Sequence, residues 1–100
     1  MKITHKITYA PDNIYNDTNS IASNCNTIVF DNYGEVDCEV YVNDTLHGHL
    51  GYRFYLKAGV SLRLGGLRDC ICQDIFDIAF SGAGLGKGVN VIRETYQLLT

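Results

Sequence analysis

Residues 36–64 have the sequence VDCEVYVNDTLHGHLGYRFYLKAGVSLRL, and this stretch decides the fold of the chain. Apolar and polar side chains alternate in its first part, with apolar residues at Val36, Cys38, Val40 and Val42. A period of two is typical of a β-strand that has one buried face and one solvent-exposed face. The pattern therefore predicts a strand over these residues, with the valines and the cysteine pointing inward.

Turn-forming residues divide the remainder of this stretch. Asn43 and Asp44 tolerate left-handed backbone and bond to it locally, which favours a turn. A second apolar run follows at 52–56, a further break at 57–59, and a return to alternation at 60–64. Strand-like runs separated by turn signals predict a β-meander at the centre of a small all-β domain.

Strand patterns recur along the rest of the chain. We expect further strands at residues 3–9, 27–30, 74–80 and 89–96. Lysines on the polar face of the first of these suit an edge strand, because charge there discourages unwanted pairing. Strands at this spacing favour a single small antiparallel β-sandwich of about seven strands, with residues 1–100 forming one domain.

Several segments lack a strand pattern. Residues 10–26 include Pro11 and are rich in Asn, Asp, Ser and Thr. This composition predicts a long N-terminal surface loop that could contain a short helical turn. Residues 67–73 fit helical spacing and strand spacing equally well. We expect 81–88 to be a glycine-rich connector and 97–100 a tail.

Composition and charge exclude several classes of function. The net charge of −3, with eight Lys and Arg residues, lacks the basic surface on which nucleic-acid binding depends. No apolar run approaches the roughly 20 residues that a membrane-spanning helix needs. The start of the chain lacks the apolar core of a signal peptide, so we expect synthesis in a reducing cytoplasm, with the four cysteines as free thiols. Among these, Cys25 and Cys38 have apolar neighbours that suit small core residues.

The glycine-rich run at 82–88 matches no nucleotide-binding motif. Gly86-Lys87 resembles the end of a phosphate-binding loop, but Ser81 stands where the first glycine belongs and Gly88 where the hydroxyl belongs. The dinucleotide fingerprint fails as well, because no frame of the run places a glycine at the required third position. We expect a hairpin loop here and no cofactor.

Two pairs of residues raise the question of a metal or a thiol catalyst. Cys70 and Cys72 could share one strand face, as could His47 and His49, and together they would supply zinc ligands. Structural zinc sites, however, usually have two to four residues between their cysteines. A cysteine nucleophile with a histidine base is conceivable, but nothing in the sequence brings the two together. We therefore expect packing for the cysteines and a solvated turn for the histidines, with no metal and no catalytic residue.

A few side chains are suited to contact with other proteins. Glu35, Asp37 and Glu39 form the polar face of one predicted strand and suit a solvated acidic surface better than calcium binding or acid–base catalysis. Exposed aromatic residues are typical of protein interfaces. The candidate contact residues are Ile14, Tyr15, Tyr41, Tyr55 and Lys87.

Four short pieces of the sequence resemble a known class of proteins. These pieces are Val40-Tyr41-Val42-Asn43, Ala58-Gly59-Val60-Ser61-Leu62, Ile78-Ala79-Phe80 and Val91-Ile92-Arg93-Glu94-Thr95-Tyr96. Across residues 27–96 they resemble the small β-sandwich, immunoglobulin-like accessory proteins of tailed-bacteriophage virions. Immunoglobulin-like modules of other kinds share these motifs, although the chain has no tryptophan and so lacks the Cys…Trp…Cys core of antibody domains.

The resemblance implies a structural role without catalysis. It implies a capsid decoration protein that binds the major capsid protein, or a head-fibre or head–tail joining component, made in the host cytoplasm and located in the virion. Such a protein can also form a homo-oligomer on a symmetric shell. Two alternatives remain open from the residues: a soluble carbohydrate- or peptide-binding module that uses Tyr41 and Tyr55, and a small metal-dependent or thiol enzyme.

Overall fold

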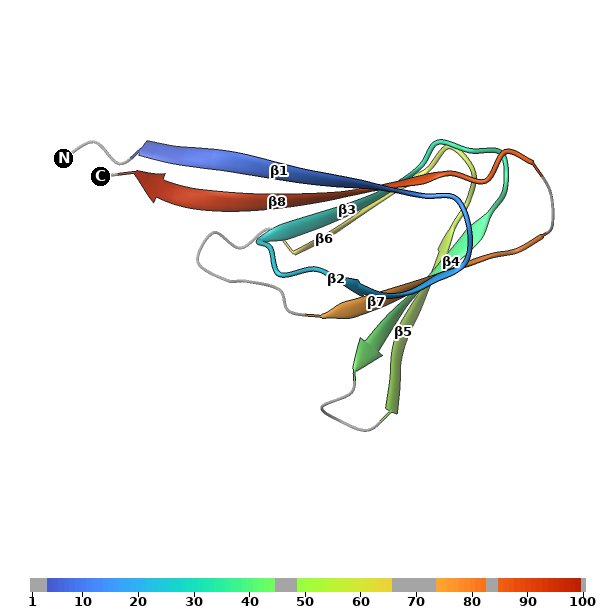
Figure 1. Cartoon of the computed structure of the whole chain (residues 1–100). Helices are drawn as coiled ribbons and strands as arrows, with labels where there is room; N and C mark the ends of the chain where they lie inside the picture. The colour runs from blue at the N-terminus through green and yellow to red at the C-terminus, as the bar shows by residue number, and fades with distance from the viewer. Residues whose placement is uncertain (1–3, 45–48, 66–73, 83–84, 100) are drawn as a thin grey trace.

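The computed structural model describes residues 4–44, 49–65, 74–82 and 85–99 (Figure 1). Its side chains are described for residues 11–42, 53–65, 74–82 and 85–95. All regular structure in the described part of the chain is β-strand. The strands are β1 Thr4–Ile14, β2 Thr18–Ala22, β3 Thr27–Asn32, β4 Cys38–Asp44, β5 His49–Leu56, β6 Ser61–Gly65, β7 Ile75–Phe80 and β8 Val89–Leu99.

The eight strands form two antiparallel sheets. One sheet has the order β1-β8-β3-β6 and the other the order β2-β7-β4-β5 (Figure 1). Consecutive strands therefore lie mostly in opposite sheets, and the first and last strands are neighbours. This is the connectivity of a jelly roll, a sandwich built from two Greek keys. The antiparallel β-sandwich predicted from the sequence is confirmed, and its strand order differs from that of an immunoglobulin constant domain, in which the sheets are ABED and CFG.

The predicted central meander is wrong in one connection. β4 and β5 pair as expected, but β6 pairs with β3 in the other sheet. Residues 57–60 make this crossing, and Gly59 adopts a φ of 82° there, with its N–H donating to the carbonyl of Asn32 at 2.7 Å. Alternation of side chains records which face of a strand is buried but not which strand lies beside it, so the sequence pattern could not distinguish the two connections.

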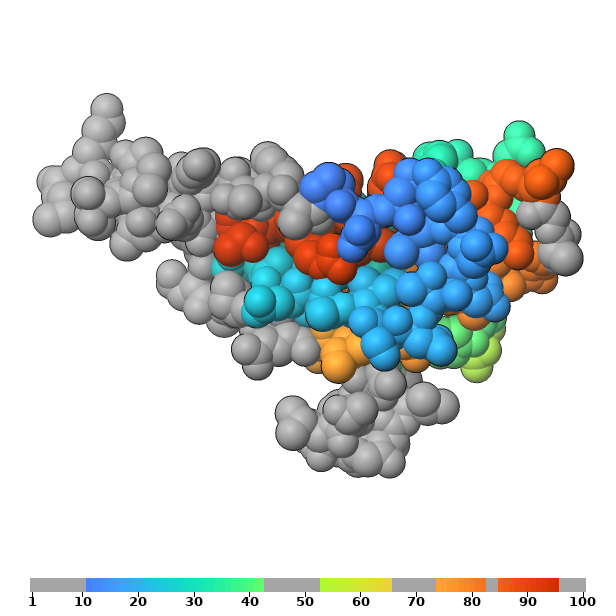
Figure 2. Space-filling model, viewed as in Figure 1, coloured from blue at the N-terminus to red at the C-terminus, as the bar shows by residue number. Residues whose placement is uncertain are grey.

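The long loop predicted for residues 10–26 is also wrong. β1 continues through Pro11 to Ile14, and β2 occupies Thr18–Ala22, with no helical turn in between. Proline is tolerated because β1 is an edge strand, as the lysines predicted, and an edge strand can spare a ladder hydrogen bond. Figure 2 shows this part of the chain (blue) packed across one side of the molecule between β8 (red) and β7 (orange).

The last strand extends beyond its predicted end. β8 continues to Leu99, so Gln97–Leu99 are strand residues and not a tail. β3 reaches only as far as Glu94 on β8, which pairs with Thr27. Beyond this point Thr95–Leu99 pair with Thr4–Thr8 of β1, and this two-stranded extension, which we call the β1/β8 ribbon, projects from the sandwich in Figure 1.

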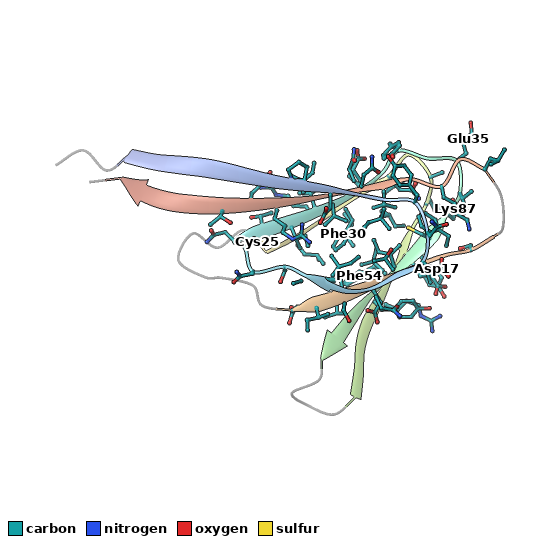
Figure 3. All side chains as sticks on the ribbon, viewed as in Figure 1. Asp17, Cys25, Phe30, Glu35, Phe54 and Lys87 are labelled. Carbon is teal, nitrogen blue, oxygen red and sulfur yellow. The ribbon has the colours of Figure 1, made fainter. Side chains whose placement is uncertain are left out.

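Apolar side chains from both sheets fill the space between them. The rings of Phe30 on β3 and Phe76 on β7 meet edge to face, with centroids 5.1 Å apart, and Figure 3 shows Phe30 between the sheets. In the strand predicted at 74–80, Phe76 and Ile78 are buried, while Phe80 is half-buried against the core. The buried apolar residues are Ile21, Cys25, Ile28, Phe30, Cys38, Val40, Leu56, Phe76, Ile78, Val89 and Val91.

Two loops are held together at one end of the sandwich by glycine backbone. The N–H of Gly34 donates to the carbonyl of Gly88 at 3.2 Å, and the N–H of Glu35 donates to the carbonyl of Gly86 at 2.7 Å. A Cβ atom on residue 34 would collide with the carbonyl oxygen of Gly86 and lie 2.7 Å from the nitrogen of Gly88. The glycine-rich run therefore has a structural role where the structure describes it.

Gly34→Ala is expected to destabilise the protein by about 1–3 kcal/mol, because the new methyl group would push two backbone segments apart. The melting temperature should fall by about 5–15 °C in a thermal unfolding experiment followed by circular dichroism. Gly82→Ala is the matched control, since a Cβ atom there meets nothing within 4 Å. Equal melting temperatures for the two variants would contradict the close approach of these loops.

Candidate protein-binding surface

The β4–β5 hairpin presents four predominantly polar side chains on the outer face of its sheet. In the register of the hairpin, Glu39 lies opposite Tyr55 and Tyr41 lies opposite Arg53. Their sequence neighbours Cys38, Val40 and Leu56 are buried in the core, so strand alternation directs these four residues outward. We call this set, Glu39, Tyr41, Arg53 and Tyr55, the tyrosine–arginine patch.

Arg53 is the centre of the patch. Its Cζ atom lies 5.7 Å from the ring centroid of Tyr41 and 5.7 Å from that of Tyr55. Its Nη1 atom lies 3.6 Å from Oε1 of Glu39, and the hydroxyl of Tyr41 donates a hydrogen bond to Oε2 of the same carboxylate. Cation–π contacts and an ion pair thus hold the guanidinium in place while half of its side chain stays exposed.

The surroundings of Tyr41 and Arg53 favour the protonated form of both groups. The hydrogen bond to Glu39 raises the pKa of Tyr41, because the phenol must keep its proton to donate. The pKa of Arg53 is raised by the negative charge that Tyr55 carries at high pH, and next by Glu39. The patch therefore offers a neutral phenol and a fixed cation, and neither group is tuned to exchange protons near pH 7.

The exposed aromatic surface of the patch is its main binding feature. The Tyr55 side chain is 71% exposed, which is high for a large aromatic residue within a strand. Tyrosine and arginine are among the residues enriched at interfaces and at their energetic centres. Because the side chains contact each other before any partner arrives, little conformational entropy is lost on binding.

Tyr15 lies in a different place, at the end of the molecule where the loops gather. It follows β1 directly and is 57% exposed. A hydrogen bond with the neighbouring Tyr33, which is 47% exposed, raises the pKa of Tyr15. The Tyr33 hydroxyl in turn donates to Oδ1 of Asn13 at 2.6 Å. A second exposed pair of tyrosines therefore stands apart from the patch.

The remaining two candidate contact residues are less available to a partner. Ile14 is partly buried and packs against the core. Lys87 is half-buried, with its Nζ atom 5.6 Å from the ring centroid of Phe80. Figure 3 shows Lys87 at the same end of the molecule as Asp17 and Glu35. Of the five candidates, Tyr41 and Tyr55 lie on the same face of the hairpin, each against Arg53.

Arg53 and Tyr33 were not singled out from the sequence. Arg53 stands two positions before Tyr55, so alternation alone would have placed both on one face. Its position over Tyr41 required the register of the hairpin, which a sequence does not show. The neighbour of Tyr33, Tyr15, comes from a segment predicted to be a loop.

The predicted acidic face does not form an ion-binding cluster. Asp37 accepts a hydrogen bond from the N–H of Ala58 at 2.8 Å, Glu39 belongs to the patch, and Glu35 is exposed beside Gly86. No group of three or more metal-ligating side chains occurs among the described residues. His47, Cys70 and Cys72 lie outside the described residues, as does the side chain of His49, so the zinc hypothesis for them stays untested.

Cys25 and Cys38 are buried free thiols, as predicted for small core residues. Burial, followed by the charge of Asp37, raises the pKa of the Cys38 thiol from 9.0 to about 11. Such a thiol is almost entirely protonated at neutral pH and is therefore a poor nucleophile.

We predict that Cys38 resists alkylation in the native protein. At pH 8 its thiolate fraction should be about a hundred-fold below that of a thiol with a pKa of 9.0, because the two values differ by two units. Iodoacetamide labelling with peptide mass spectrometry should modify Cys38 only after denaturation. The pKa of Cys38 is higher in the folded protein than in the unfolded chain. The contribution of this thiol to the free energy of unfolding is therefore complete below pH 9 and is lost as the pH rises through about 11. Rapid labelling of Cys38 at pH 8 would contradict its burial.

In the part of the chain that the structure describes, there is no helix with the length and apolar character to cross a bilayer. Comparisons with protein-family models, with curated proteins and with solved structures gave no match to the chain.

Proposed function

We propose that this chain is a non-enzymatic structural protein of a bacteriophage virion, an auxiliary capsid protein that binds the major capsid protein through the tyrosine–arginine patch. The observation that carries the proposal is the exposed Tyr55 ring beside a fixed guanidinium on an open sheet face. An open face suits contact with another protein, whereas small-molecule sites are usually concave.

The architecture and the resemblance of the sequence support the same role. Jelly rolls serve as capsid domains and as binding modules, and the sheet faces offer a rigid platform for a repeated contact. On a symmetric shell many copies bind at once, so a modest interface in each copy is sufficient.

Cosedimentation with capsids assembled without this chain tests the proposal. The wild-type protein is expected to bind saturably, and Tyr55→Ala should weaken binding by about 10–30-fold, as expected for an aromatic residue at an energetic centre. Tyr15→Ala is the matched comparison, because it removes an exposed tyrosine at the loop end. Loss of binding with Tyr15→Ala alone would place the contact at the loops and contradict a role for the patch.

A carbohydrate-binding function is the second candidate. Tyr55 offers an exposed ring, and the neighbouring Arg53 and Glu39 offer hydrogen-bonding groups of both polarities. Jelly rolls also form lectin domains. A glycan array separates the two functions: a saccharide that binds wild type but not Tyr55→Ala, with no binding to capsids, would favour this alternative.

A further inference from the structure

The β1/β8 ribbon is incompletely paired. Beyond Glu94, the only strand that pairs with β8 in the described part of the chain is β1. A two-stranded ribbon is marginally stable in water on its own, and three or more strands are usually needed. Among the described residues no strand pairs with its outer edges, and the N–H and C=O groups of such an edge are a template for a further strand.

The free edge of β8 can be assigned to particular backbone groups. The N–H of Asn26 donates to the carbonyl of Glu94 at 3.0 Å, so the carbonyl of Glu94 points toward the β3 side of the strand. In antiparallel strands successive residues direct their backbone groups to opposite sides. Tyr96 and Leu98 therefore present their N–H and C=O groups at the free edge, while Thr95 and Gln97 present theirs to β1.

We propose that two copies of this chain pair through the free edges of β8, antiparallel about a two-fold axis at Gln97. In this register Tyr96 of each copy lies opposite Leu98 of the other, and each such pair exchanges two backbone hydrogen bonds. The two ribbons then form one continuous sheet in the order β1-β8-β8-β1. Pairing by strand addition of this kind depends on main-chain hydrogen bonds.

The register avoids the part of β8 that already pairs with β3. With the axis at Gln97, Leu99 of one copy lies opposite Thr95 of the other. The new pairing therefore ends one residue short of Glu94, where β3 already occupies the edge. In this register both Tyr96 and Leu98 of each copy form backbone hydrogen bonds with the other copy. A two-fold axis at Tyr96 would instead place Leu98 opposite Glu94, which already pairs with β3.

Charge favours a second copy as the occupant. Residues 95–99 have the sequence TYQLL and carry no charge, so two copies approach without repulsion. The outer edge of the ribbon, β1, contains Lys6 and therefore opposes pairing with itself. The β1 edge of the ribbon is thus protected from pairing with a second β1, whereas the β8 edge can pair with the β8 edge of a second copy. This proposal does not depend on the proposed function.

Amide hydrogen exchange followed by NMR tests the pairing directly. At low concentration the amide protons of Tyr96 and Leu98 should exchange freely, and they should become protected as the concentration rises and dimers form in sedimentation velocity. The amides of Thr95 and Gln97 should be protected at every concentration, because they bond to β1. Protection of all four amides in a monomer, or of none in a dimer, would overturn the proposal.

A pair of variants separates backbone pairing from side-chain packing. Leu98→Pro removes one free N–H from each copy and should raise the dimer dissociation constant on the order of 30-fold, because two hydrogen bonds are lost in each dimer. Leu98→Ala keeps that N–H and should dimerise more strongly than Leu98→Pro. Unchanged chemical shifts of Phe30 and Phe76 would show that the sandwich is intact.

Two further results would overturn the proposal. One is a wild-type protein that stays monomeric at NMR concentrations. The other is a Leu98→Pro variant that loses capsid binding while dimerisation is unaffected, which would make the edge a docking strand for a different protein. If the protein does not dimerise but still binds capsids, the dimer proposal is wrong and the proposed function of the tyrosine–arginine patch still stands.

Discussion

Replacing Phe30 with alanine is expected to lower the free energy of unfolding by about 3–5 kcal/mol, because the substitution removes a fully buried ring and leaves a cavity. A protein of this length has a total stability of only about 5–15 kcal/mol. The variant should therefore be largely unfolded at a few molar urea, where the wild type remains folded. Urea unfolding followed by tyrosine fluorescence measures the difference.

The same experiment tests how the two sheets contact each other. Phe30 and Phe76 come from different sheets, and their rings meet at an interplanar angle of 63°. Alanine at both positions should lower the free energy of unfolding by about 0.5–1.5 kcal/mol less than the sum of the two single substitutions. Additive effects would show that the rings do not touch and would contradict the packing of the sandwich.

Asn32→Ala is expected to destabilise the protein by about 3 kcal/mol, a large effect for the loss of one polar side chain. Asn32 is fully buried at the end of β3, and its Nδ2 donates to the carbonyls of Val36 at 2.9 Å and Leu56 at 3.0 Å. Its Oδ1 accepts from the N–H of Gly34 at 3.2 Å. Alanine would remove the donor to the carbonyls of Val36 and Leu56, while the N–H of Gly34 keeps its bond to Gly88, and burying a polar group without its partner is costly. The urea midpoint measures the loss.

Asn19→Ala is the control for this prediction. Asn19 is exposed on β2, so its substitution should change stability by no more than about 0.5 kcal/mol. If Asn32→Ala were as stable as Asn19→Ala, the link that Asn32 makes between the end of β3 and the end of β5 would be absent in solution.

Side-chain alternation predicted which faces of the strands are buried. Cys38 and Val40 were assigned inward and are buried, and Val42, also assigned inward, is partly buried against the core. Strand pairing could not be predicted in the same way, because the period-two pattern is identical whichever neighbour a strand has. For this reason β6 was placed beside β5, although it crosses to β3.

Local signals were misleading where the tertiary structure outweighed them. Pro11 was taken as the end of a strand, yet an edge position removes the cost of its missing N–H. The polar composition of residues 18–22 concealed β2, whose burial pattern shows Ile21 as its one buried side chain. A single inward residue gives too little periodicity to detect.

The candidate site was predictable in part. Tyr41 and Tyr55 follow from alternation, because each stands on the polar face of its strand. The role of Arg53 depends on its being opposite Tyr41, which is a property of the hairpin register. Ile14 was chosen from a segment that was expected to be a loop; it ends β1 and is partly buried against the core.

A cryo-electron-microscopy reconstruction of the assembled virion tests the central claim most directly. The account predicts that this chain decorates the shell with the outer face of the β2-β7-β4-β5 sheet against the major capsid protein, and with Tyr55 and Arg53 buried in the contact. A particle that lacks the chain, or that carries it with the tyrosine–arginine patch facing solvent, would contradict the account.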